Sequence, residues 1–217
     1  MRPESPTLTW WPKLGYGYFP VDEFLAGRQP YDERYWERYH TYVDTEIGRA
    51  LNEARVELVK RHWPGQVVDV GIGSGQFIEA HGNARGYDIC APAVRWLCER
   101  ELFSDPGAEL VEAVTCWDSL EHFRRPQDLL DRVLKWAFIS MPVYQSAEDA
   151  LNSRHFRPDE HYWYFTREGF ERWASGRGWM IVEFSRVESE LGRDSIGSWA
   201  LKRNCDVSAK LKHPHSH

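Results

Sequence analysis

The sequence predicts an α/β fold in which a mostly parallel sheet carries helices on both faces and ends in a terminal antiparallel strand pair. From residue 66 onward, short β-branched runs alternate with helix-forming segments, an order typical of parallel sheets. The last two expected strands, 180–188 and 196–202, are joined by the turn Leu191-Gly192-Arg193-Asp194, which indicates antiparallel pairing.

The other elements follow from the N-terminus. Residues 1–20 are rich in proline, glycine and aromatic side chains, which predicts an irregular arm. Residues 32–61 contain good helix formers with apolar residues at helical spacing, so we expect one helix there, ended by Pro64-Gly65. Strands are expected at 66–70, 84–88, 111–117 and 136–141, and helices through about His81 and at 93–100, 126–134 and 166–175.

Composition and charge narrow the class of protein. With 217 residues, 42% of them hydrophobic, the chain suits one domain at 45–203, preceded by an arm and helix at 1–44 and followed by a disordered tail at 204–217. No apolar run approaches the roughly 20 residues that span a bilayer, and the N-terminus lacks the apolar stretch of a secretory signal. We therefore expect no membrane partner and a cytoplasmic location. The net charge of −6 argues against a nucleic-acid duplex as partner but leaves open a single nucleotide or a short RNA end.

A glycine-rich turn follows the first buried strand. Residues 67–70 run directly into Gly71-Ile72-Gly73-Ser74-Gly75, and glycines at such a turn let the backbone approach a ligand closely. A dinucleotide site would need glycine where Gln76 stands, which disfavours a nicotinamide cofactor. Asp88 ends the next strand, where an acid can accept hydrogen bonds from both ribose hydroxyls of an adenosine. A plain tight turn and a surface aspartate are the alternatives.

These motifs resemble a known family. The segment VVDVGIGSG at residues 67–75 resembles the first motif of class I S-adenosylmethionine-dependent methyltransferases, and Asp88 matches their ribose-binding acid. The segment CWDSLEHF at 116–123 resembles the D-x-L-E-H segment of the subgroup that includes quinone O-methyltransferases, and ISMP at 139–142 is similar to its fifth strand. The resemblance covers roughly residues 45–203 and implies a Rossmann-like fold with S-adenosylmethionine as methyl donor.

The resemblance also implies the residues that bind this cofactor. The glycines would pack against its methionine end, Asp69 would position its amino group or the loop, and Trp117 would lie close to it. The implied set is Asp69, Gly71, Gly73, Gly75, Asp88, Ile89, Trp117 and Asp118. A third strand, which usually supplies an adenine contact, cannot be identified between Leu102 and Leu110.

A cluster of acids and histidines predicts either a metal site or a general base. Asp118, Glu121 and His122 are spaced i, i+3 and i+4, so a helix starting here would place all three on one face. Residues 159–173 resemble a segment of the small-RNA 3′-end 2′-O-methyltransferases, which bind a divalent metal through an acid-x-x-Glu-His motif and a distant histidine; this adds His161. Mixed oxygen and nitrogen ligands favour Mg²⁺, Mn²⁺ or Fe²⁺.

The same residues also allow a site without metal. Glu121 and His122 would then line the cofactor cleft as catalytic residues, with His122 as general base, and His161 would be a hydrogen-bonded core histidine.

Aromatic residues crowd the N-terminal segment between Trp10 and Tyr42. They fit a lid over the active site, packing within the molecule or a contact in an oligomer. The function that the sequence favours is methylation of an oxygen or nitrogen on a small-molecule or nucleoside-like acceptor. A metal-dependent RNA 2′-O-methyltransferase and a non-catalytic cofactor-binding module are the alternatives.

Overall fold

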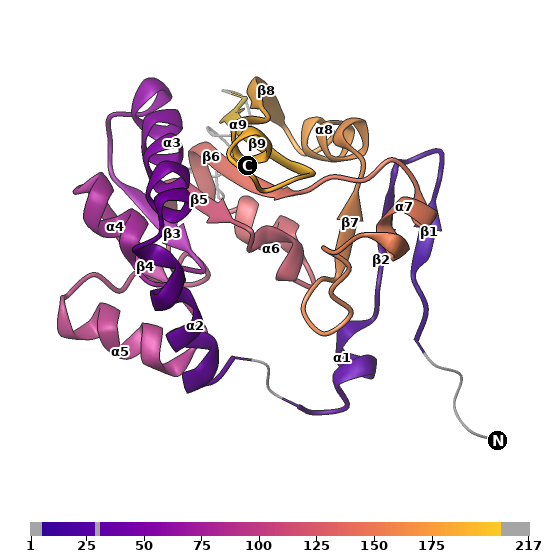
Figure 1. Ribbon diagram of the computed structural model, residues 1–217. Helices are drawn as coiled ribbons and strands as arrows, with labels where there is room; N and C mark the ends of the chain where they lie inside the picture. The colour runs from indigo at the N-terminus through magenta and orange to yellow at the C-terminus, as the bar shows by residue number, and fades with distance from the viewer. Residues whose placement is uncertain (1–5, 29–30, 205–217) are drawn as a thin grey trace.

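The computed structural model describes residues 6–28 and 31–204. Within these ranges the main sheet contains β3 (Val67–Val70), β4 (Ala84–Tyr87), β5 (Val111–Trp117), β6 (Val133–Pro142), β8 (Trp179–Ser185) and β9 (Ile196–Arg203). Their order is β4-β3-β5-β6-β9-β8, and the first four run parallel (Figure 1). Because β9 pairs antiparallel with both β6 and β8, the expected sheet is confirmed.

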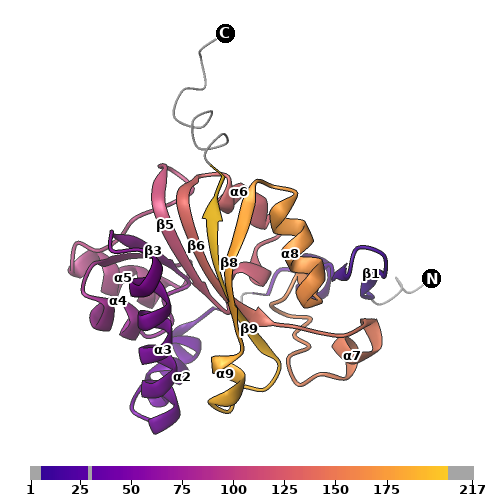
Figure 2. The same ribbon diagram turned by 90° about the horizontal axis from the view of Figure 1, so that it is seen from above.

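Helices cover both faces of this sheet. Five of them do so: α3 (Glu46–His62), α4 (Gln76–His81), α5 (Ala91–Glu99), α6 (Pro126–Leu130) and α8 (Arg167–Ser175). Along β5, Ala113 and Trp117 pack in the cluster that holds α3, α4 and α5, whereas Val114 and Cys116 pack in the cluster that holds α6 and α8. Alternate residues of one strand therefore supply two cores, one on each side of the sheet (Figure 2).

The remaining helices are short or lie before the sheet. They are α1 (Val21–Leu25), α2 (Glu33–Val43), α7 (Ala147–Asn152), α9 (Val187–Glu190) and the 3-10 turn η1 (Leu120–His122). The single helix expected over 32–61 is wrong, because α2 and α3 are separate helices. Thr45 begins α3, and its side chain accepts a hydrogen bond from the backbone N–H of Gly48 at 3.0 Å.

The irregular arm expected over residues 1–20 is wrong over part of its length. β1 (Thr9–Trp11) and β2 (Tyr16–Tyr18) pair antiparallel, and β2 pairs in turn with β7 (Trp163–Phe165). Aromatic residues favour strands, but the partner strand lies about 145 positions away in the chain. The backbone hydrogen bonds of β2 are therefore made in part with a strand that is remote in the chain.

Several boundaries also differ from the expectation, and one strand is nearly missing. The helix expected to reach residue 134 ends at Leu130, because β6 already begins at Val133. β8 ends at Ser185, where α9 follows after one residue. The missing third strand is reduced to one parallel bridge between Gly86 and Phe103.

Two expectations concern the ends and the surroundings of the chain. Of the expected disordered tail, residues 205–217 lie outside the described part of the chain. In the part that is described, each helix is too short or too polar to cross a bilayer.

Candidate functional site

Two adjoining cavities lie where the parallel strands end. The first cavity has a volume of about 550 Å³ and the second about 430 Å³. Both are lined by Tyr39, Gly71, Gly73, Trp117, Asp118, His122 and Glu160. The first cavity extends to Asp88 and α1, and the second extends to α3 and the segment after α7. In an open α/β sheet this edge is where ligands bind.

The glycine turn has the backbone geometry that only glycine adopts easily. Gly71, Gly73 and Gly75 have φ values of 81°, 54° and 81°. A Cβ on Gly71 would lie 2.8 Å from Cβ of Ser119, and one on Gly75 would lie 2.7 Å from the ring of Trp96. Gly71 and Gly73 line both cavities, whereas Gly75 lines neither and packs under Trp96. The role of Gly75 is thus in packing and in starting α4.

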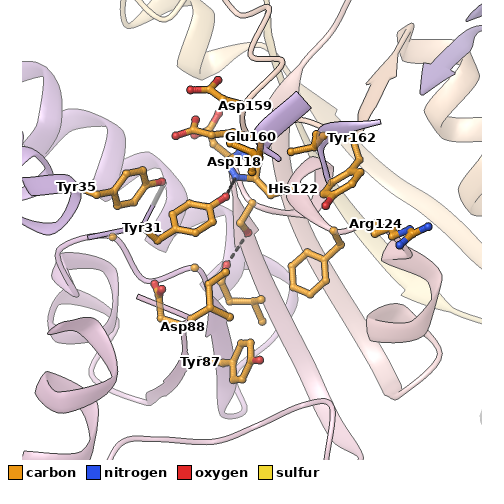
Figure 3. A pocket seen from close by; sticks show the side chains of 18 of the residues that line it. Tyr31, Tyr35, Tyr87, Asp88, Asp118, His122, Arg124, Asp159, Glu160 and Tyr162 are labelled. Carbon is orange, nitrogen blue, oxygen red and sulfur yellow. Dashed lines mark hydrogen bonds between the residues drawn. The ribbon is translucent and has the colours of Figure 1, made fainter. Parts of the chain in front are cut away.

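Asp88 is held rigidly at one end of the first cavity, opposite Tyr162 and Arg124 (Figure 3). Its carboxylate accepts hydrogen bonds from the backbone N–H groups of Ile72 at 2.9 Å and Cys90 at 2.8 Å. Burial raises the pKa of this carboxyl, although those N–H groups oppose the rise. Ile89 lines the same end of the cavity. Both residues thus lie where the predicted adenosine half of a cofactor would be.

Asp69 lies in the wall of the second cavity, below the glycine turn. Its side chain is buried and accepts a hydrogen bond from the Thr115 hydroxyl at 2.7 Å. Burial raises the pKa of Asp69 to about 7, and Thr115 and Arg55 only partly offset this. A cationic ligand group in this cavity would therefore meet a carboxyl that ionises near neutral pH.

Asp118 does not share a face with Glu121 and His122, so that expectation is wrong. The 3-10 turn η1 begins only at Leu120, and Asp118 has a φ of 54° before it. Its carboxylate accepts hydrogen bonds from Arg55 at 3.0 Å and from Arg193 at 2.6 and 3.0 Å. Although burial acts to raise its pKa, Arg193 and Arg55 hold the pKa of Asp118 well below its ordinary value.

The two arginines also share a second acid. Arg55 donates to the buried Glu188 at 2.9 and 2.7 Å, and Arg193 donates to it at 2.7 Å. Two cations and two anions thus form a neutral network between α3, α9 and the end of β5. Arg55 also lies over the ring of Trp117, with 5.3 Å from its guanidinium carbon to the ring centroid. Trp117 lines both cavities, so the network supports their shared wall.

Glu121, His122 and His161 form a compact group of potential metal ligands. One ligand atom from each lies within 4.8 Å of the others. Both carboxylate oxygens of Glu121 and Nδ1 of His161 are buried without a hydrogen-bond partner among the described residues. Such unpaired buried atoms are costly and call for a partner. A divalent cation that prefers nitrogen and oxygen ligands fits this donor set.

Burial sets the protonation of this group. It raises the pKa of Glu121 well above its ordinary value, and nearby Asp118 adds to the rise. Burial also lowers the pKa of His122 to about 4, and it lowers the pKa of His161 as well. Both imidazoles are therefore neutral at physiological pH, and each keeps one nitrogen lone pair.

Tyrosines from the N-terminal segment reach this group. The Tyr31 hydroxyl lies 3.0 Å from Nδ1 of His122, and it points toward that ring across the first cavity (Figure 3). Tyr35 and Tyr39 line the same cavity. Other aromatic residues of the segment pack inside the molecule, as Phe19 does against Phe156. The segment is thus divided between a cavity wall and internal packing.

Sequence reasoning missed three residues of this site, whereas Tyr31 belongs to the aromatic segment for which a lid over the active site was one expectation. The three are Arg55, Glu188 and Arg193, whose partners are 63 to 133 positions away in the chain, apart from the Arg193–Glu188 pair five positions apart. No local spacing marks such contacts. The one local signal was the acid-x-x-Glu-His segment, which indicated where the partners would gather.

A family model described as a methyltransferase domain matches residues 35–183. A comparison with curated protein sequences finds no match. Among solved structures, a possible histamine N-methyltransferase from Thermotoga maritima has a TM-score of 0.57 at 14% identity, covering 79% of this chain and 98% of that one.

Two further solved structures have similar scores. A 1,6-didemethyltoxoflavin-N1-methyltransferase from Burkholderia thailandensis has a TM-score of 0.53 at 16% identity, over 92% of this chain and 99% of that one. The methyltransferase domain of a bacterial Hen1 protein has a TM-score of 0.52 at 16% identity, over 74% and 100%. At these identities the likeness concerns the fold.

Proposed function

We propose that this chain methylates a hydroxyl group. It belongs to the methyltransferase domain family and is a class I S-adenosylmethionine-dependent methyltransferase. The acceptor is a small-molecule or nucleoside-like compound, and its hydroxyl lies beside a divalent cation held by Glu121, His122 and His161. The observation that carries this is the buried carboxylate of Glu121, whose two oxygens have no hydrogen-bond partner within the described residues.

The side chains of Glu121, His122 and His161 together are better suited to bind a divalent cation than to hold a proton. One carboxylate and two neutral imidazoles suit Mn²⁺ or Fe²⁺, and suit Mg²⁺ less well because it prefers oxygen ligands; the set leaves further coordination positions for acceptor oxygens. When bound, the cation would lower the pKa of the acceptor hydroxyl, so no strong base is needed. The carboxyl of Glu121 would give up its proton to bind the cation, since ligands must be deprotonated.

The chain's own residues orient this group. Burial raises the pKa of Tyr31, so its hydroxyl stays protonated and can pair with His122 in either sense. With Nδ1–H of His122 donating to the Tyr31 oxygen, Nε2 keeps the lone pair that a cation requires. Tyr31 is therefore a positioning residue for the His122 ring.

The cofactor fits across the two cavities. Asp88 would accept its ribose hydroxyls in the first cavity, and Gly71 and Gly73 would leave room for its methionine end on the way to Asp69 in the second. His122 lines both cavities, so a hydroxyl near this ring would lie at their junction. In-line attack on the methyl group requires the acceptor to be near that position.

Manganese binding tests the proposal without knowledge of the acceptor. Calorimetry and electron paramagnetic resonance should detect one Mn²⁺ per chain, and Glu121→Gln or His161→Ala should weaken its binding by about a hundredfold. His62→Gln is the matched control, because His62 is the last residue of α3, pairs with Glu183 and lines neither cavity. If the wild-type protein binds no Mn²⁺, or binds it as well after Glu121→Gln, the metal site is wrong.

Activity gives a second test once an acceptor is found. Chelator should abolish formation of S-adenosylhomocysteine, and Mg²⁺ or Mn²⁺ should restore it. Full turnover in excess chelator would favour His122 as general base, and His122→Ala should then lower turnover by roughly 10²–10⁴.

A further inference from the structure

The two cavities carry opposite charge. The first is lined by Asp22, Asp88, Asp118, Asp159 and Glu160 against only Arg28 and Arg124. The second is lined by Arg55, Arg154, Arg157 and Arg193 against Asp69, Asp118 and Glu160. His155 adds no positive charge, because burial lowers its pKa. In a chain with a net charge of −6, a basic cavity departs from the average surface.

Not all of these arginines are free to meet a ligand. Arg55 and Arg193 are neutralised by Asp118 and Glu188 at 2.6–3.0 Å. Arg154 and Arg157 have weaker partners, since Arg154 lies 3.6 Å from the exposed carboxylate of Asp194 and Arg157 lies 3.3 Å from Glu160. Asp194 is not part of the cavity lining, so this end of the second cavity keeps a surplus of positive charge.

Arg154 and Arg157, called here the arginine wall, are connected through the backbone to the proposed cation site. The backbone N–H groups of Glu160 and His161 both donate to the carbonyl of Arg157, at 3.1 and 2.8 Å. One tight turn therefore fixes Arg157 and His161 together, and both side chains line the second cavity. A ligand in the second cavity can therefore contact His161 and Arg157 together.

We propose that Arg154 and Arg157 bind an oxyanion, a phosphate or a carboxylate, of the methyl acceptor. This inference rests on the proposed function. The acceptor is then a hydroxylated anion, with its oxyanion on the arginine wall and its hydroxyl at Glu121, His122 and His161. The surplus of positive charge at the end of the second cavity formed by Arg154 and Arg157 agrees with this assignment, because it would attract an anionic group of the acceptor.

The methionine carboxylate of the cofactor is the competing occupant of these arginines. It would lie near Asp69 and the glycine turn, which are in the part of the second cavity formed with α3. Arg154 and Arg157 come from the segment after α7. The two occupants predict different effects on cofactor binding, so one measurement separates them.

Calorimetry on the full chain with saturating S-adenosylhomocysteine and Mn²⁺ tests the inference. The probes are inorganic phosphate and ribose 5-phosphate for a phosphate, gluconate for a carboxylate, and ribose as the neutral compound. At least one anion should bind, with ribose at least tenfold weaker. Arg157→Gln and Arg154→Gln should each weaken that anion by about tenfold to a hundredfold and leave the Kd of S-adenosylhomocysteine within twofold. Arg125→Gln, which lines neither cavity and pairs with the exposed Asp128, is the matched control and should change neither.

Three results would overturn the inference. They are equal binding of ribose and the anions, no binding of any anion, and a loss of S-adenosylhomocysteine affinity in Arg157→Gln and Arg154→Gln. Mn²⁺ binding is measured in the same samples. Its loss in the wild-type protein would count against the proposed function, whereas failure of the anions alone leaves that function standing.

Discussion

Replacing Asp69 by asparagine should stabilise the protein at neutral pH. Burial raises the pKa of Asp69 from 3.8 to about 7 in the folded chain. Because the folded state holds this proton more tightly, its stabilising effect is complete below pH 4 and is lost as the pH rises toward 7. A pKa difference of about three, at about 1.4 kcal/mol each, amounts to about 4 kcal/mol. Asparagine has no such proton and can still accept the Thr115 hydrogen bond.

Urea denaturation of the wild-type protein and of Asp69→Asn between pH 4.5 and 8 measures this effect. The difference in unfolding free energy should change by a few kcal/mol in favour of Asp69→Asn as the pH rises. Calorimetry at pH 6.5 in two buffers of different ionisation enthalpy should also show release of a proton when S-adenosylmethionine binds, and Asp69→Asn should lack it. A stability difference that is constant with pH would refute the assignment of a raised pKa to Asp69.

The remaining predictions concern the walls of the two cavities. Arg193→Gln should destabilise the protein by about 3–5 kcal/mol in urea denaturation, because it leaves two acids with one partner; Arg186→Gln, for which no side-chain contact is described, should have little effect. Asp88→Ala should weaken S-adenosylhomocysteine binding by about 1–3 kcal/mol in calorimetry through lost ribose hydrogen bonds, and unchanged affinity would contradict the role of Asp88. Gly75→Ala should lower the stability by more than about 1 kcal/mol, since φ is positive and the new Cβ meets Trp96; a thermal midpoint equal to wild type would show that the turn adapts.

The sheet was predictable because its signals are local. β3 is fully buried, β5 is buried at all but one position, and β4 alternates buried and half-buried residues. The glycine turn and Asp88 lie at strand ends by their place in the chain. The three-stranded sheet of β1, β2 and β7 was not predictable, since Tyr16 pairs with Phe165, which is remote in the chain and carries no local signal of this pairing. The break between α2 and α3 depends on Thr45, which helix spacing alone did not mark.

The candidate site was predictable in its members but not in its geometry. Glu121, His122 and His161 gather as the motif indicated, although 39 residues separate the two histidines. Asp118 is not part of this group, for two reasons that its spacing in the sequence could not show. The turn η1 begins after it, and Arg55 and Arg193 arrive from remote segments to bind its carboxylate.

The different surroundings of Asp118 and Glu121 separate their functions. The two acids are three residues apart, yet arginines hold the pKa of Asp118 low while burial raises that of Glu121. An ionised carboxylate saturated by two guanidinium groups has few lone pairs left for a ligand, so Asp118 serves to fix the shared wall of the cavities. An unpaired carboxyl is costly until a ligand reaches it, so Glu121 remains available. Acids whose environments drive their pKa values apart divide into structural and reactive groups. Here the division leaves the carboxyl of Glu121 beside the imidazoles of His122 and His161, and His122 lines both cavities.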